Sequence, residues 1–447
     1  MVLCLLFLVS IPAITPYLRG DGNGYYAWVR SAVIDGDLHF ENEYRRADPA
    51  FRTEMFDEKG ELRREKRTST GHVDDHWGVG AAALWSPFFL VAHAVVTVAR
   101  AAGIHWQADG FSLPYRWACA FGTALFGFLS LLIAYQLARR RLSDGAALVG
   151  VLVVWGASSL FVYQYLLPFW PFASAAFAGA LLLLLWDRPG PIPPLRWLVM
   201  GVLAGLAFAI HPVAVAWAVL PLLAVVRLPG LRAKASALGL LALGAPLGAA
   251  PQLFGKAIVY GSPFTSGYDV KLREPQLFRI LFGANHGLFS WTPIAFIALV
   301  GIVWPLWRRD RRLAQALITV FLAMLVVITF FQLHEQSSYG NRFFVAFTPG
   351  FVIGAASVYE GLRGRWRRVA VAIGVLAVAW NVLFAFQWAW GMTRKQGPVH
   401  WSTVVSNQFT RAPRELVHAA RLFVTDRGAL IHHVQQVDLE RRRAGVP

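Results

Sequence analysis

Long apolar runs constrain this chain more than any other feature of its sequence. Eleven of them approach the roughly 17–25 residues that an α-helix needs to cross a bilayer. Only 15% of the residues are charged, against about 25% in ordinary soluble domains. We therefore predict an all-α protein, a polytopic membrane helical bundle of about 11 transmembrane helices. The runs lie near 1–18, 116–138, 145–165, 170–187, 196–211, 213–227, 234–254, 288–307, 313–333, 342–362 and 369–390.

A twelfth apolar run, 79–101, is ambiguous, and the basic residues decide where we place it. If this run lies along the membrane surface, the arginine clusters between the spans fall on one side, which the positive-inside rule makes cytoplasmic. If it crosses, the cluster at 139–141 falls on the opposite side. We therefore place the amino terminus inside and interpret 1–18 as a retained span, not a signal peptide. Residues 19–115 are then expected to form one large external loop that contains interfacial helices.

The charge of the chain excludes some classes of function. The formal net charge of +17 comes from arginine clusters between apolar runs, and such clusters more often orient helices than bind nucleic acid, so no nucleic-acid partner is expected. The spans carry almost no acidic residues, which weakens a proton pump or coupled transporter. The sequence has no P-loop, His-Glu-x-x-His or Cys-x-x-Cys motif, so ATP-driven transport and zinc proteolysis have no support.

The first external loop is unusually acidic. It holds 13 of the 25 Asp and Glu residues, between Asp21 and Asp75. Asp21 follows the first span in the string Arg-Gly-Asp-Gly-Asn-Gly-Tyr-Tyr of residues 19–26. We expect the glycines to let the backbone approach a ligand, and a carboxylate at this level can accept a proton from an attacking hydroxyl. The alternative is that Asp21 caps the short helix that begins near Tyr25, since aspartate is a favoured N-cap.

Two further acidic strings lie in the same loop. Residues 35–44, which include Asp37, alternate acids with other residues, and such oxygen donors could hold a divalent cation. They fall short of an EF-hand loop, so a solvated turn is the expected structure. Asp74-Asp75-His76-Trp77 precedes the run 79–101, where a helix start is the favoured interpretation and a metal site or part of a sugar pocket are the alternatives. We predict no metal and no cofactor, with a divalent cation as the alternative.

Polar residues recur in the later external turns. Arg342 is the only basic residue of the turn 335–342, so the orientation rule does not explain it. A guanidinium there matches a phosphate of a lipid carrier, and the alternative is snorkelling to headgroups. His211 could bind phosphate or contribute a proton, although a lone histidine at a helix end is more often structural. The other candidates, chosen by their loop positions, are Lys256, His286 and Tyr339.

Three short strings in these turns carry a resemblance to a known family. They are Gly261-Ser-Pro-Phe-Thr-Ser-Gly-Tyr268, Gly287-Leu-Phe-Ser-Trp-Thr-Pro293 and Tyr339-Gly-Asn-Arg-Phe-Phe344. With an acid after the first span, a long external first loop and a many-span bundle, the chain resembles the C-type membrane glycosyltransferases (GT-C). That superfamily includes protein O-mannosyltransferases, the lipid A aminoarabinose transferase and an uncharacterised bacterial branch. The resemblance covers most of 1–390, with 255–287 as a second large external loop. We expect the remaining basic tail, 391–447, to be external.

The resemblance implies a sugar donor linked to a polyprenyl phosphate, attack on the external face and usually inversion at the anomeric carbon. Asp21 aligns in position with the family's catalytic acid. Gly22 stands where the family commonly has a second acid or a short polar residue, which makes a metal-dependent site less expected. Arg342 would hold the carrier phosphate, and Arg116, Lys256 or His211 would do so by location. The remaining substrate-binding candidates are Tyr25, Asp37, Asp75, His76, His286 and Tyr339.

These observations predict a glycosyltransferase of the bacterial inner membrane with Asp21 as general base. Its partners would be the polyprenyl-phosphate sugar donor, membrane lipids and a glycan, lipid or protein acceptor. The alternative is a transporter or flippase that moves a lipid-linked sugar or polysaccharide without forming a bond. A third possibility is a non-catalytic scaffold in an envelope assembly.

Overall fold

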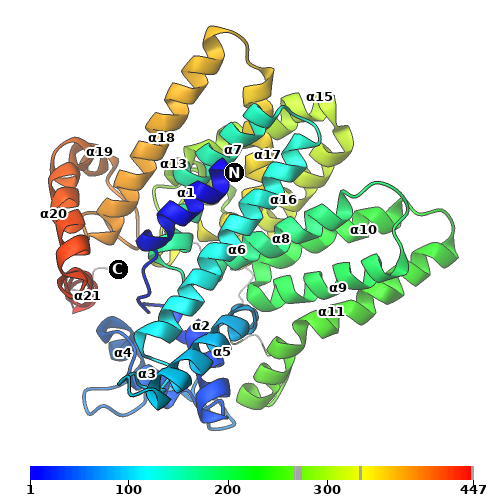
Figure 1. Ribbon diagram of the computed structural model, residues 1–447. Helices are drawn as coiled ribbons and strands as arrows, with labels where there is room; N and C mark the ends of the chain where they lie inside the picture. The colour runs from blue at the N-terminus through cyan, green and yellow to red at the C-terminus, as the bar shows by residue number, and fades with distance from the viewer. Residues whose placement is uncertain (266, 268–273, 332–334, 444–447) are drawn as a thin grey trace. The chain divides into compact units, whose positions relative to one another are not determined.

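The computed structural model describes residues 1–265, 267, 274–331 and 335–443, and helices dominate it (Figure 1). Within these residues the only extended pairing consists of two isolated β-bridges, Phe56 with Leu62 and Arg67 with Val73. Every one of the eleven expected spans contains helix, so the all-α membrane fold is confirmed. Two residues of the first family string, 266 and 268, lie outside the described part.

Length and composition single out six helices of the described chain as able to cross a membrane. Five of them match expected spans. The sixth is α5 (Gly80–Ala101), the ambiguous run, which is 22 residues long. Its position along the membrane surface, and with it the membrane side of each loop, stays a prediction. The other six expected spans contain shorter apolar helices or interrupted ones.

The chain divides into two compact units, which we describe separately. The first unit comprises residues 1–129 and 163–269. Its helices are α1 (Val2–Ser10), η1 (Ile11–Ala13), α2 (Gly22–Arg30), η2 (Ser31–Asp35), α3 (Glu41–Arg45), α4 (Pro49–Met55), η3 (Arg64–Lys66), α5, the first part of α6 (Leu113–Arg139), most of η4 (Val162–Leu166), α8 (Phe172–Trp186), α9 (Pro194–Ile210), η5 (Pro212–Ala218), α10 (Val219–Val226) and α11 (Leu231–Tyr260).

The second unit comprises residues 130–162 and 270–447. Besides the end of α6, its helices are α7 (Asp144–Ala157), α12 (Leu277–Phe282), α13 (Leu288–Trp291), α14 (Pro293–Gly301), η6 (Ile302–Leu306), α15 (Trp307–Arg309), α16 (Arg311–Phe331), η8 (Arg342–Phe347), α17 (Thr348–Gly361), α18 (Arg365–Ala389), α19 (Trp401–Phe409), α20 (Arg411–Thr425) and α21 (Arg427–Arg443).

In the first unit, α9 and α11 pack side by side through glycines (green in Figure 1). A Cβ on Gly205 would lie 1.9 Å from the carbonyl oxygen of Ala245, and one on Gly248 would lie 1.8 Å from that of Val202. The two backbones therefore touch directly, as small residues allow in membrane helix pairs. Beyond α9 the chain breaks at His211, as its neighbour Pro212 predicts.

In the second unit, several expected spans are interrupted. The run 145–165 forms α7 only to Ala157 and then breaks at Ser158 and Ser159. The run 288–307 breaks at Thr292, between α13 and α14, and the run 342–362 begins as the 3-10 helix η8. Helix α17 packs on both α7 and α14. These interruptions are therefore enclosed by protein, which non-helical backbone at membrane depth requires.

Two details of the expected organisation were wrong. Helix α11 continues to Tyr260, so Lys256 lies on this helix and not on the loop predicted at 255–287. Helix α5 begins at Gly80 with Val79 at its N-cap and without a side-chain cap, so Asp74 and Asp75 do not start it. The predicted tail 391–447 contains three helices, α19 to α21, before its last four residues, which lie outside the described part.

Candidate active site

Asp21 lies at the N-cap position of α2, in the first unit. Its backbone is already helical, with φ −52° and ψ −25°, and its side chain makes no capping hydrogen bond. The side chain is half-buried. The structure therefore contradicts the alternative in which Asp21 serves as the side-chain cap of this helix.

The backbone around Asp21 is held by Asp48. Asp48 Oδ2 accepts hydrogen bonds from Gly20 N at 3.0 Å and from Asn23 Nδ2 at 2.7 Å. Its other oxygen, Oδ1, accepts from Phe51 N at 3.2 Å and so caps α4. One buried carboxylate thus ties both sides of Asp21 to a second helix. Asp48 was not among the predicted residues, although an Asp directly before Pro49 is a signal for a helix start.

The glycines near Asp21 have roles other than the one expected. A Cβ on Gly24 would lie 1.9 Å from the Trp77 ring, and one on Gly22 would lie 2.9 Å from Phe169 Cβ. These two glycines therefore make room for aromatic packing and do not free the backbone for a ligand. Gly20 does use its conformational freedom, because its φ is +53°.

Helix α2 is entirely buried and carries the aromatic residues of the string. The Tyr25 ring lies 6.5 Å from the Trp77 ring and is 2% exposed. Tyr26 donates to the Gly110 carbonyl oxygen at 2.5 Å. The enclosure of Tyr25 does not test its predicted role in orienting a substrate, which stays a prediction.

Asp75 is the centre of a buried hydrogen-bond network. Trp28 Nε1 donates to Oδ1 at 2.9 Å, and the Tyr44 hydroxyl donates to Oδ2 at 2.8 Å. Lys256 Nζ donates to the Asp75 carbonyl oxygen at 2.7 Å and lies over the rings of Trp28 and Tyr260. Burial raises the pKa of the Asp75 carboxyl, while the Lys256 ammonium and the two hydrogen bonds oppose this rise.

This network joins two predicted residues whose sequence positions are far apart. Asp75 and Lys256 are both fully buried, and their bond links the first loop to the last turn of α11. Next to Asp75, the His76 ring stacks on Trp77 at 4.1 Å, and burial lowers the pKa of His76 to about 4. His76 is therefore neutral at pH 7. A neutral imidazole can accept or donate a hydrogen bond but adds no positive charge for a phosphate.

A second buried carboxylate in the loop, Glu43, was missed. Arg30 donates to Glu43 Oε1 at 2.7 Å and also to Asp35. Glu43 Oε2 is buried without a hydrogen-bond partner, and burial raises the pKa of Glu43 to about 7. The solvated turn expected for residues 35–44 is therefore wrong for Glu43, which is 3% exposed.

Asp37, from the same string, is exposed as expected for a turn. Its Oδ1 accepts from Ser31 Oγ at 2.9 Å and from His39 N at 3.1 Å. Slight burial raises the pKa of Asp37, but the two hydrogen bonds together lower it by more, so the pKa lies below its usual value. Among the described residues no group of three or more His, Cys, Asp or Glu side chains is placed to hold a metal ion.

His211 contributes to the break between α9 and η5. Its Nδ1 accepts from Val213 N at 3.2 Å, so the side chain caps η5. It is 8% exposed and lies against the Phe172 ring. This local role matches the structural alternative, and phosphate binding by His211 stays a prediction.

The remaining predicted residues lie in the second unit. Arg342 is 3% exposed, lies over the Phe343 ring and donates to Gln336 O at 3.2 Å and Gln336 Oε1 at 3.3 Å. This burial contradicts headgroup snorkelling as its explanation. Tyr339 donates to Asn381 Oδ1 at 2.8 Å.

His286 is fully buried in the same unit and takes a left-handed backbone, with φ +57°. Its Nε2 donates to the Ser338 carbonyl oxygen at 2.9 Å, and its ring stacks on Trp291. The hydrogen bond joins residues directly before the strings at 287–293 and 339–344. Within the strings, the Trp291 ring meets the Tyr339 ring edge-on at 5.5 Å, so these two of the three strings meet in space.

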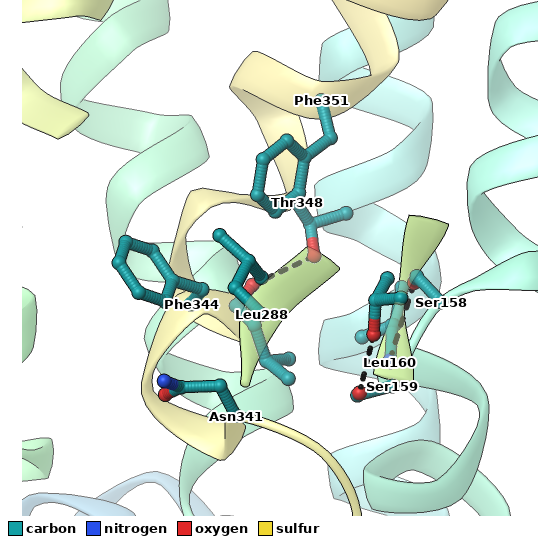
Figure 2. A pocket seen from close by; sticks show the side chains of 10 residues that line it. Ser158, Ser159, Leu160, Leu288, Asn341, Phe344, Thr348 and Phe351 are labelled. Carbon is teal, nitrogen blue, oxygen red and sulfur yellow. Dashed lines mark hydrogen bonds between the residues drawn. The ribbon is translucent and has the colours of Figure 1, made fainter. Parts of the chain in front are cut away.

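A small cavity lies at the interrupted helices of this unit (Figure 2). Ser159 Oγ and Thr292 Oγ1 are 3.1 Å apart on its wall, and Thr348 Oγ1 donates to the Val345 carbonyl oxygen at 2.7 Å. The cavity volume is about 10 Å³, which is room for about one water molecule. It is therefore too small for a sugar or a lipid phosphate.

No protein-family model matches this chain, and no curated protein sequence matches it. Two crystal structures of ArnT from Cupriavidus metallidurans do match it in fold. The apo structure has a TM-score of 0.53 at 16% identity and covers 100% of this chain and 75% of that one. The structure bound to undecaprenyl phosphate has a TM-score of 0.52 at 17% identity, with 100% and 74% covered.

The chain has the fold of ArnT. ArnT is an aminoarabinose transferase of the GT-C superfamily, so the resemblance inferred from the loop strings is confirmed at the level of fold. The match extends over the whole chain, including the C-terminal helices that the sequence resemblance left out.

Proposed function

We propose that this chain is a glycosyltransferase that moves a sugar from a polyprenyl-phosphate carrier to an acceptor at the external face of the bacterial inner membrane. One observation carries the proposal: the whole chain matches the fold of ArnT, and one ArnT structure holds undecaprenyl phosphate, a polyprenyl phosphate. The apolar helices support a location in the membrane, where such a carrier resides.

Asp21 is the proposed general base. Its carboxylate would take the proton of the acceptor hydroxyl while the oxygen attacks the anomeric carbon. The bond from that carbon to the carrier phosphate would break, and polyprenyl phosphate would leave with the bonding electrons. Attack opposite the leaving group inverts the anomeric centre. The hydrogen bonds from Gly20 and Asn23 to Asp48 support this role because they fix the backbone that carries the base.

The departing phosphate needs positive charge, which is the proposed task of Arg342. Arg342 already donates to Gln336, so a phosphate would replace Gln336 as the acceptor of these hydrogen bonds. A guanidinium suits this exchange, because it presents several donors in a fixed plane. A glycan, a lipid or a protein could supply the attacking hydroxyl.

The test compares Asp21→Asn with Asp21→Glu and with the control Asp57→Asn, an exposed aspartate of the same loop. Isolated membranes receive a radiolabelled sugar on polyprenyl phosphate, and label in new acceptors is counted. We expect Asp21→Asn to lose at least about a hundredfold in rate and the control to retain wild-type activity. Full transfer by folded Asp21→Asn overturns the mechanism. If the wild type moves labelled lipid across the bilayer and transfers no sugar to an acceptor, the proposal of a glycosyltransferase is overturned in favour of a flippase.

A further inference from the structure

Helix α20 presents an apolar stripe that the rest of its unit leaves uncovered. Pro413, Val417, Ala420 and Val424 follow one another at intervals of four, three and four residues and so share one side of the helix. Val417 is 72% exposed and Val424 is 82% exposed. The buried side of α20 is a different one, because it contains Ala412 and Ala419.

The preceding helix extends this uncovered surface. At the end of α19, Phe409 is 78% exposed, and Val405 one turn earlier is 44% exposed. We call the four large residues together, Val405, Phe409, Val417 and Val424, the α19–α20 apolar surface.

A row of arginines runs beside the stripe. Arg414 and Arg421 each follow a stripe residue by one position, and both are exposed. Arg411 also lies on the exposed side. An apolar stripe edged by guanidinium groups is the arrangement of helices that lie in the boundary layer of a membrane, with aliphatic groups among acyl chains and arginines on phosphates.

Contacts with α18 place this surface beside a membrane span. Gln408 Nε2 donates to the Trp380 carbonyl oxygen at 3.0 Å, and Trp380 precedes the end of α18 by nine residues. At about 1.5 Å per residue, the corner between α19 and α20 lies some 14 Å before that end. Figure 1 shows α19 and α20, in orange and red, beside α18.

Further along α20, contacts reach the end of the span. Trp390, directly after α18, donates from Nε1 to Glu415 Oε2 at 3.2 Å, and its ring meets the His418 ring edge-on at 6.3 Å. Tryptophan favours the membrane–water interface. With Trp390 at this interface, Phe409 would lie at the depth of the acyl chains, and Arg414 and Arg421 would flank the level of the headgroups.

We propose that the α19–α20 apolar surface, with Arg414 and Arg421, binds the anionic phospholipids of the surrounding bilayer. The positive charge beside the stripe selects anionic headgroups over zwitterionic ones. This segment, which the sequence presents as a basic tail, is then a second membrane-bound element of the unit. The inference is independent of the proposed transferase activity.

The experiment uses the full chain in nanodiscs of phosphatidylcholine, with or without phosphatidylglycerol. Cys4 is exposed and Cys119 is buried, so a Cys4→Ser background accepts a fluorophore at one introduced cysteine. The probe is attached in turn to Phe409→Cys, to Val417→Cys and to the control Ala429→Cys, an exposed position on α21. Lipids with a nitroxide on the acyl chain quench a fluorophore that contacts them.

We expect quenching at positions 409 and 417 to be severalfold stronger than at 429. Adding Arg414→Glu and Arg421→Glu should weaken quenching at 417 in the phosphatidylglycerol discs, whereas Arg52→Glu and Arg64→Glu, on exposed arginines of the first loop, should not. Equal quenching at all three positions overturns the proposal. Disulfide cross-linking of unlabelled Phe409→Cys to a second copy, with no lipid quenching of the labelled variant, overturns it in favour of a protein interface.

Discussion

Asn23 donates a hydrogen bond from Nδ2 to Asp48 Oδ2 over 2.7 Å. Both side chains are buried, with 6% and 8% exposed, so water does not compete strongly for this bond. The same Asn23 nitrogen also donates to the Gly20 carbonyl oxygen at 2.9 Å. The bond therefore sets the conformation of the turn that carries Asp21.

Asp48→Ala tests this positioning. The substitution removes three acceptor contacts, to Gly20, Asn23 and Phe51, and should lower kcat by about ten- to a hundredfold, because a misplaced base loses its alignment. KM should change much less. The matched control is Asp57→Ala, which also loses hydrogen bonds from backbone N–H groups but at an exposed turn. A higher KM with an unchanged kcat would contradict a positioning role.

Gly24→Ala tests the packing of α2 against Trp77. The added methyl would lie 1.9 Å from the ring, so either the helix or the indole must move, at a cost of about 1–3 kcal/mol. We expect a lower thermal unfolding temperature in detergent. Gly239→Ala is the control, because nothing lies within 4 Å of its added Cβ on α11. Equal unfolding temperatures for the two variants would show that the Trp77 ring moves aside at little cost in stability.

Glu43 makes the stability of the first loop depend on pH. Burial raises its pKa from 4.5 to about 7. Between about pH 4.5 and 7, Glu43 keeps a proton in the folded loop and loses it in the unfolded loop. The free energy of unfolding therefore falls as the pH rises through this window and is constant above pH 7. The difference corresponds to about 3 kcal/mol.

Hydrogen exchange measures this dependence directly. Protection of residues 31–47, corrected for intrinsic exchange rates, should decrease across the window in the wild type. Glu43→Gln is neutral at every pH and should make the profile less steep, with the buried Asp75 carboxyl supplying the remaining slope. Glu58→Gln, at an exposed position, should leave the profile unchanged. A profile that keeps its slope in Glu43→Gln would assign the titration to another group.

Lys256→Met tests whether the buried ammonium holds the loop. It leaves the Asp75 carbonyl oxygen without this donor and the buried carboxyl without its neighbouring positive charge. We expect a loss of about 3 kcal/mol, as for other buried pairs that lose one partner. Lys234→Met, near the start of the same helix, should cost far less. The double variant Lys256→Met with Asp75→Asn should recover part of the loss, and failure to recover would argue against coupling of the pair.

Hydropathy predicted the spans because the bilayer imposes it on every lipid-facing helix. It could not detect the break at Ser158 and Ser159, since small hydroxyl residues barely change the apolar average. The end of α11 had a local signal that was missed: Gly261, with φ +74°, follows Tyr260 as a glycine often follows a helix. With that signal, Lys256 would have been placed on the helix.

The predicted site residues fall into those chosen from local sequence and those whose contacts join distant parts of the sequence. Asp21 was chosen for its position directly after the first span, and its role as general base stays a prediction. The bond from Lys256 to Asp75 joins residues 181 positions apart, and no pattern in a single sequence reports such a pair. Glu43 was missed because its burial and its bond to Arg30 are set by tertiary packing. Asp48 had a local signal as the N-cap before Pro49, but its bonds to Gly20 and Asn23 had none.

The interrupted helices also constrain how the protein enters the membrane. Helix α7 has 14 residues, and α14 with its continuation through η6 and α15 has nine, five and three, or 17 in all. Their lengths of about 21 and 26 Å are shorter than the roughly 30 Å hydrocarbon core. Neither segment crosses the hydrocarbon core by itself, and the unpaired backbone groups at its break cannot face lipid. They need α17, which is made later, to cover them. The final packing of α7 and α14 therefore cannot form before α17 has been synthesised.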